Sequence, residues 1–135
     1  MVNRIDQSRT EAAHFNVNVL VVEDESVARR ALDKLLKRSG YNTIAVESGE
    51  EALRFLRHNE GPHVALIDLD LPGMNGAELL NRLRNLSPDT HAVIMTATSA
   101  ERVRDLVGDH HIPHLRKPLD FRVLLRVLSQ EVRPN

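Results

Sequence analysis

The sequence predicts an α/β fold in which short buried strands alternate with amphipathic helices. Apolar runs rich in β-branched residues recur along the 135 residues, and stretches with helical apolar spacing follow them. Strict alternation of strand and helix implies a parallel sheet, joined by right-handed crossovers and covered by helices on both faces. The length suits one domain with a real hydrophobic core and is too short for two ordinary ones.

Five strands are expected, each at an apolar or weakly alternating run. They cover residues 18–22, 41–46, 63–68, 92–96 and 112–115. The first and third runs are almost wholly apolar, as is typical of strands that are buried on both faces of a parallel sheet.

Five helices are expected between and after these strands. Ser26 is suited to cap a helix over residues 27–38, and Gly40 supplies its stop. Ser48 and Glu51 form a capping box for the second helix, which ends before Gly61. The remaining helices carry the leucines of residues 79–86, cover residues 100–107, and run from an Asp120 cap to about residue 128.

Five strand–helix units in about 120 residues favour one flavodoxin-like, doubly wound (βα)5 domain with strand order 2-1-3-4-5, because a closed barrel needs eight. We expect residues 1–15, which are polar and aperiodic, to be a flexible tail and residues 16–132 to be the domain. No output domain is expected after the last helix.

Composition narrows the class of protein. The formal net charge is −1, so no overall field favours nucleic acid or anionic membrane as a partner. No apolar run reaches the ~18 residues of a membrane span, and the N-terminus has no secretory signal pattern. The absence of cysteine excludes disulfides and thiolate metal sites. A cytoplasmic protein is the expectation.

Polar residues stand at the ends of the predicted strands. Glu23 and Asp24 follow the first strand, Asp68 ends the third, Thr96 ends the fourth, and Lys117 follows the fifth. Strands one, three and four are neighbours in the predicted order, and ligands of such sheets bind at the carboxyl ends of the strands. These side chains are therefore expected to share one pocket.

The residue types in this pocket indicate phosphoryl chemistry. Clustered carboxylates repel one another unless a proton or a cation joins them, and an oxygen-rich set suits Mg²⁺. A lysine and a hydroxyl at the rim can neutralise and orient a phosphoryl group. A carboxylate can itself be the nucleophile and form an aspartyl phosphate.

Four short motifs resemble the signatures of the response-regulator receiver domain of two-component signalling, in its chemotaxis-regulator-like form. They are VVEDE at 21–25, LIDLDLPGMNG at 66–76, MTA at 95–97 and KP at 117–118. The resemblance covers roughly residues 17–132. It implies that Asp68 accepts a phosphoryl group from a phosphohistidine on a histidine kinase or histidine phosphotransfer protein. Such a domain signals by conformational change and catalyses only its own phosphorylation and dephosphorylation, so it is not classed as an enzyme.

The resemblance also implies roles for the other pocket residues. Glu23 and Asp24 match the acidic pair that binds Mg²⁺ together with Asp68, and Asp24 is the expected direct ligand. The backbone carbonyl of Asp70 would be a further ligand, with its side chain in solvent. Thr96 would bind a phosphoryl oxygen and move on activation, and Lys117 would pair with the phosphoryl group.

The sequence departs from the family pattern before the fifth strand. His114, preceded by Pro113, stands where the family commonly has the aromatic switch residue that is coupled to Thr96. We take His114 as the switch position. His110 and His111 are interpreted, with His114, as parts of a polar loop and not as a zinc site, because no further ligand stands at a suitable spacing.

Two other functions fit part of the pattern. A pseudo-receiver would keep the fold as a protein-binding module without accepting phosphate. A haloacid-dehalogenase-type phosphatase also uses an Asp-x-Asp nucleophile, but on its first strand, whereas Asp68 and Asp70 follow the third. Taken alone, Asp68 could be an aspartate that only caps a turn before Pro72–Gly73, but its occurrence together with the other three motifs disfavours this interpretation.

The last helix carries more apolar residues than one core face needs. Phe121, Leu124, Leu125 and Leu128 are expected to face the core. Val123 and Val127 form a second stripe, which we interpret as a surface for a downstream protein target or for a homodimer.

Overall fold

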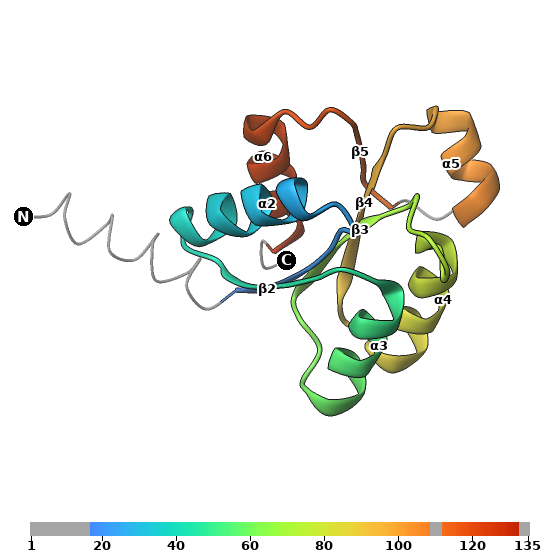
Figure 1. Cartoon of the computed structure of the whole chain (residues 1–135), viewed down its shortest axis with the longest axis horizontal. Coiled ribbons are helices and arrows are strands. Elements are labelled where there is room, and N and C mark those ends of the chain that lie inside the picture. The colour runs from blue at the N-terminus through green and yellow to red at the C-terminus, as the bar shows by residue number, and fades with distance from the viewer. Residues whose placement is uncertain (1–16, 109–111, 133–135) are drawn as a thin grey trace, which may run out of the picture.

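The computed structural model describes residues 17–108 and 112–132, and these form one five-stranded parallel sheet (Figure 1). The strand order is β2-β1-β3-β4-β5, as predicted. The strands are β1 Asn18–Val22, β2 Asn42–Val46, β3 Val64–Asp68, β4 His91–Thr96 and β5 His114–Arg116. The first four lie within one residue of their predicted bounds, whereas β5 is shorter and begins later than expected.

Helices cover both faces of the sheet, which confirms the doubly wound fold. α2 and α6 lie on one face, and α3, α4 and α5 lie on the other (Figure 1). The helices are α2 Ser26–Arg38, α3 Gly49–His58, α4 Gly76–Leu86, α5 Ala100–Val107 and α6 Phe121–Glu131. None of the helices in residues 17–108 and 112–132 is long and apolar enough to cross a membrane.

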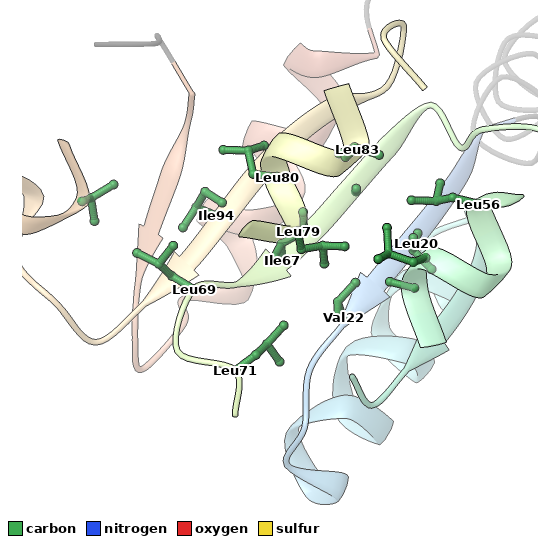
Figure 2. Close-up of a cluster of buried hydrophobic side chains, with 14 residues drawn as sticks. Leu20, Val22, Leu56, Ile67, Leu69, Leu71, Leu79, Leu80, Leu83 and Ile94 are labelled. Carbon is green, nitrogen blue, oxygen red and sulfur yellow. The ribbon is translucent and has the colours of Figure 1, made fainter. Parts of the chain in front are cut away.

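The alternation of side chains along the strands builds a separate core on each face. Leu20 and Val22 of β1 point to the face of α3 and α4, where they pack with Ile67 and Leu79 (Figure 2). Val19 and Val21 point to the opposite face, together with buried leucines from α2 and α6. β3 is buried along its whole length, because it lies in the middle of the sheet with helices on both sides.

Two of the three predicted helix caps form. The Ser48 side chain accepts a hydrogen bond from the Glu51 N–H, and the Asp120 side chain accepts one from Arg122. The prediction that Ser26 caps α2 is wrong. α2 already begins at Ser26, Glu25 occupies the cap position, and no side-chain cap bond forms.

The apolar stripes of α6 differ from the expectation. Leu124 and Leu128 are fully buried, and Val123, Leu125 and Val127 are partly buried against the same core. Phe121, predicted to be in the core, is 44% exposed because the first turn of α6 lies at the mouth of a groove beside α2. Phe121 is therefore the most exposed apolar residue of this helix, and the two valines are partly buried against the core.

The predicted tail of residues 1–15 lies outside the described residues, as do His110 and His111. The division of the chain into a tail and a domain of residues 16–132 stays a prediction.

Candidate functional site

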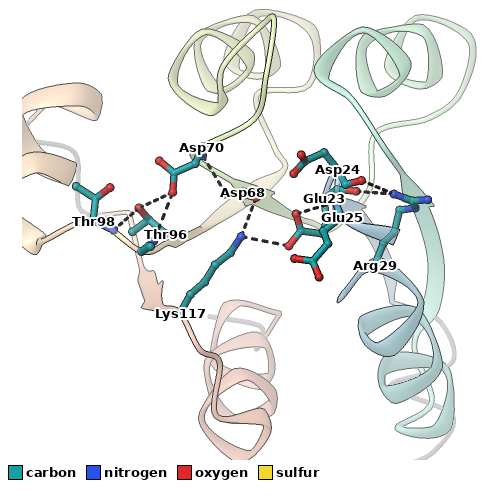
Figure 3. A network of polar contacts seen from close by, with 10 residues as sticks. Glu23, Asp24, Glu25, Arg29, Asp68, Asp70, Thr96, Thr98 and Lys117 are labelled. Carbon is teal, nitrogen blue, oxygen red and sulfur yellow. Dashed lines mark hydrogen bonds and ion pairs between the residues drawn. The ribbon is translucent and has the colours of Figure 1, made fainter. Parts of the chain in front are cut away.

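Strand register brings the predicted polar residues to one edge of the sheet. Asp68 is the last residue of β3 and pairs with Met95 of β4, next to Thr96. On the other side Ile67 pairs with Val22, so that Glu23 and Asp24 leave β1 beside Asp68. Figure 3 shows the resulting arrangement, with Asp68 central, the acidic pair on one side and Thr96 on the other.

Three carboxylates form the centre of the site. One oxygen from each of Glu23, Asp24 and Asp68 lies within 4.8 Å of the others. Glu23 and Asp68 are only 1% and 2% exposed, whereas Asp24 faces solvent. Burial of like charges at this distance is unfavourable unless cations or hydrogen-bond donors compensate it.

Lys117 supplies the cation among the described residues. Its Nζ lies 2.8 Å from Asp68 Oδ2 and 3.2 Å from Glu23 Oε1. Burial lowers the pKa of the Lys117 ammonium, but Asp68 and Glu23 outweigh burial and raise that pKa overall. Burial, reinforced by the neighbouring Asp68 carboxylate, raises the pKa of Glu23 to about 7. One lysine therefore only partly offsets the charge of the cluster.

Hydrogen-bond donors and acceptors lie on the side of Asp68 that faces away from Glu23 and Asp24 (Figure 3). The Asp70 N–H donates to Asp68 Oδ1 at 2.9 Å. Thr96, fully buried at the end of β4, accepts from the Thr98 N–H at 3.0 Å. The Thr96 hydroxyl and the Ala97 N–H both donate to Asp70 Oδ2, each at 3.4 Å. The Asp70 side chain is exposed, as the sequence predicted, and it also accepts hydrogen bonds from two donors at the end of β4.

The Arg29 side chain holds the acidic loop in place by binding the backbone of that loop. Its Nη1 donates to the carbonyl oxygens of Glu23 and Asp24, both at 3.0 Å, and its Nη2 lies 3.9 Å from Glu47 Oε2. Sequence reasoning missed this residue. The only feature of the sequence that could have indicated its role is its position, in the first turn of the helix after Glu25 and away from the face that packs into the core.

The turn after Asp70 brings α4 very close to the end of β3. The Gly76 N–H donates to the Leu69 carbonyl at 3.2 Å, and a Cβ at Gly76 would lie 2.6 Å from the Asp68 carbonyl oxygen. Asn75 caps α4 by accepting from the Glu78 N–H. Gly76, which follows the Pro72–Gly73 turn, therefore allows α4 to begin directly beside the end of β3 that carries Asp68.

The structure brings together Glu23, Asp24, Asp68, Thr96 and Lys117, as the sequence predicted. His114 lies apart from them. It is exposed at the start of β5, level with Ile94, two residues before Thr96 along β4. Within the described part of the chain, no hydrogen bond or ion pair joins His114 to Thr96.

The carboxylate set fits a divalent cation. Three carboxylates against one ammonium leave the cluster with excess negative charge, and two of the carboxylates are buried. All the candidate donors are oxygens, which are the ligands that Mg²⁺ prefers. Asp24, exposed at the mouth, would leave the ion in contact with water.

Comparison with known proteins identifies the family. The sequence model described as the response regulator receiver domain matches residues 19–129. The chain belongs to this family. Receiver domains are signalling modules of two-component systems that work with histidine kinases or phosphotransferases and bind Mg²⁺ at an acidic cluster. Membership therefore favours a receiver over a dehalogenase-type phosphatase.

Individual proteins are similar to this chain over most of its length. A cyclic di-GMP phosphodiesterase of Thermotoga maritima is 33% identical over 87% of this chain, and the match spans 31% of that protein. Sporulation initiation phosphotransferase F of Bacillus subtilis is 29% identical over 79% of this chain and 86% of its own length. A CheY-like receiver domain protein of Methanospirillum hungatei superposes with a TM-score of 0.75 at 26% identity, over 86% of this chain and 93% of that one.

Proposed function

We propose that this receiver accepts a phosphoryl group on Asp68 from a phosphohistidine. A carboxylate oxygen of Asp68 attacks phosphorus and an O–P bond forms while the P–N bond of the donor breaks. The electron pair of that bond stays on the imidazole nitrogen, which leaves as neutral histidine after protonation. The observation that supports this role is the position of Asp68, a nearly buried carboxylate bonded to Lys117 at the shared end of three strands.

The surrounding residues have separate tasks in this proposal. Lys117 orients Asp68 and neutralises charge that the phosphoryl oxygens bring, and the Asp70 N–H holds the other carboxylate oxygen. Thr96 offers a hydroxyl to a phosphoryl oxygen and would carry the conformational signal along β4. His114, exposed and away from Asp68, is a switch residue only if it moves when Thr96 moves.

Glu23, Asp24, Asp68 and the backbone carbonyl of Asp70 are the proposed Mg²⁺ ligands. When bound, Mg²⁺ would supply positive charge for the phosphoryl oxygens and offset the repulsion within the cluster. Glu23 and Asp24 are held ready for this by Arg29, which fixes their carbonyl oxygens.

Phosphoryl transfer to Asp68 requires a donor protein and, for signalling, a protein that receives the output. The donor is a histidine kinase or a histidine phosphotransfer protein, which presents its phosphohistidine at the open edge of the sheet. The output is a contact with a downstream protein or a second copy through α6, where Phe121 is the exposed apolar group. Nucleic acid and membrane are not proposed as partners, and a cytoplasmic location stays a prediction.

Phosphorylation in vitro tests the proposal. The protein is incubated with acetyl phosphate and Mg²⁺, and its intact mass is measured. We expect the mass of one added phosphoryl group in the wild type and in the surface control Asp89→Asn, and no gain in Asp68→Asn or in the presence of EDTA. No gain in the wild type would favour a pseudo-receiver, and a gain that survives Asp68→Asn would place the acceptor elsewhere.

A further inference from the structure

We propose that the groove between α3 and α4 is a docking site for an acidic segment of a partner protein. The two helices lie side by side on one face of the sheet (Figure 1), and the groove along them has a volume of about 460 Å³. Four basic side chains line it: Arg54, Arg57 and His58 from α3, and Arg82 from α4. The groove is separate from the carboxylate cluster, and its role does not depend on phosphorylation of Asp68.

Two of these arginines have no acidic partner within the protein. The exposed side chains of Arg54 and Arg57 form no hydrogen bond or ion pair in the part of the chain that the structure describes. Glu50 stands one turn before Arg54, at the spacing of a helical ion pair. Its carboxylate instead accepts the Met74 N–H at 3.2 Å. Both guanidinium groups are therefore available to carboxylates of another molecule.

The requirements of the helices do not explain this concentration of charge. Arg57 and His58 lie in the last turn of α3, where the helix dipole favours positive charge. Arg54 lies three residues before Arg57, and like charges at this spacing destabilise a helix. Arg82 comes from a different helix, and its ion pair with Glu78, at 3.7 Å between side chains 48% and 51% exposed, is of the weak surface kind. The groove thus gathers positive charge that the fold does not need, in a chain of net charge −1.

The chemistry of the groove favours a protein segment as its occupant. Buried Leu53 and half-buried Met74 also line it, and methionine adapts its shape to an apolar group of a partner. Arginine pairs with carboxylates in a bidentate geometry. A nucleic acid needs a longer run of cations, and the carboxylate of Glu50 in the same groove would repel its phosphates. The occupant that fits is an amphipathic acidic helix, with an apolar side chain on Leu53 and Met74 and carboxylates on the arginines.

Binding of a synthetic peptide to the whole chain tests the proposal. The probe is a fluorescently labelled, helix-forming peptide of about 14 residues, roughly four turns, with glutamates flanking a stripe of leucines. Fluorescence anisotropy at low salt is expected to give a dissociation constant of about 100 μM, which rises as salt screens the charges. The same peptide with glutamine in place of glutamate should not bind. Absence of binding up to about 1 mM acidic peptide, or equal binding of the glutamine peptide, would overturn the proposal.

A matched pair of double variants locates the binding. Arg54→Gln/Arg57→Gln removes the unpaired charges, keeps good helix formers, and should weaken binding of the acidic peptide about tenfold. Arg30→Gln/Arg38→Gln removes the same charge from exposed positions of α2, on the opposite face of the sheet, and should change the affinity by less than about twofold. An equal loss in both double variants would show that binding follows net charge and would overturn the assignment to the groove.

Two further probes separate classes of partner. Duplex DNA and vesicles that contain phosphatidylserine are measured with the same variants. Tighter binding of either than of the peptide, lost in Arg54→Gln/Arg57→Gln, would replace the protein partner by that class and overturn the proposal. The peptide is expected to bind Asp68→Asn as it binds the wild type, so failure of phosphorylation and failure of docking are told apart. Thermal unfolding of each variant shows that differences in affinity do not reflect misfolding.

Discussion

Arg29 is a single residue on which the metal affinity of the site is expected to depend, although it touches no carboxylate of the cluster. Its two bonds to the carbonyl oxygens of Glu23 and Asp24 fix the loop that presents these side chains. We predict that Arg29→Ala weakens Mg²⁺ binding about tenfold, the lower end of what loss of an outer support costs a metal site. Isothermal titration calorimetry measures the affinity.

Arg30→Ala is the control for this prediction. Arg30 is the next residue of α2, carries the same charge and is exposed. If the effect of Arg29 came from its charge alone, both variants would bind Mg²⁺ with similar affinity, and the positioning argument would fail.

Thr43 carries an unusual buried hydroxyl. It lies on β2 with 7% exposure, and its Oγ1 has no hydrogen-bond partner in the part of the chain that the structure describes. Valine has nearly the same shape without the hydroxyl. We predict that Thr43→Val raises the free energy of unfolding by about 1 kcal/mol, since the cost of an unsatisfied polar group is removed. Urea denaturation gives the value.

The same substitution at Thr90 should change the free energy of unfolding in the opposite direction. Thr90 Oγ1 donates to the Pro62 carbonyl at 2.6 Å and also contacts Ser87 Oγ at 2.6 Å. Thr90→Val is expected to lower the free energy of unfolding by about 1–2 kcal/mol. Two changes of the same sign would show that hydrogen bonding is not what distinguishes the two threonines.

At the scale of elements, the start of α4 depends on a glycine for a close approach. A Cβ at Gly76 would meet the backbone of Asp68 and Leu69 at 2.6 Å, and backbone cannot move aside. We predict that Gly76→Ala destabilises the fold by about 1–3 kcal/mol, the usual cost of overpacking, and displaces Asp68. Denaturation and the phosphorylation rate report the two effects.

Gly49 provides a control at an equivalent position, since it is likewise the first residue of a helix after its cap. The atoms nearest to a Cβ there belong to the Met74 side chain, at 3.1 Å or more, and none of them is backbone. Gly49→Ala is expected to change stability by less than about 0.5 kcal/mol, because methionine adapts easily. A comparable loss of stability in both variants would indicate that any substitution at the first residue of a helix is destabilising, and that the contact of Gly76 with the end of β3 is not the cause.

The sequence predicted the elements well wherever periodicity and local chemistry decide them. The parallel sheet, the helices and the Ser48 and Asp120 caps were all found, because apolar spacing and capping act within a few residues. β5 was harder, since a strand of three residues at the edge of the sheet carries little pattern. Ser26 and Phe121 were misplaced because the β1–α2 turn and the start of α6 are set by tertiary contacts.

At the scale of the whole molecule, the pocket could be predicted because strand order places the carboxyl ends of β1, β3 and β4 side by side. What the sequence could not show are the contacts between separate loops. Asp70 and Thr96 are 26 residues apart, and their bond depends on the side-chain conformation of an exposed residue. The contacts of the Arg29 and Asp70 side chains therefore emerged only from the geometry.

A cation at this edge would link elements from distant parts of the chain, so it should stabilise the whole fold. Glu23 and Asp24 leave β1, Asp68 ends β3, and their carboxylates repel one another across the two strands. We predict that Mg²⁺ at 100 times its dissociation constant raises the free energy of unfolding by about 2.7 kcal/mol. For a domain of this size that is a rise in melting temperature of roughly 10 °C. Asp24→Asn should keep the fold, because Asp24 is exposed, and should lose most of this shift. Thermal unfolding with Mg²⁺ and with EDTA measures both proteins, and an equal shift in the two would exclude Asp24 from the metal site.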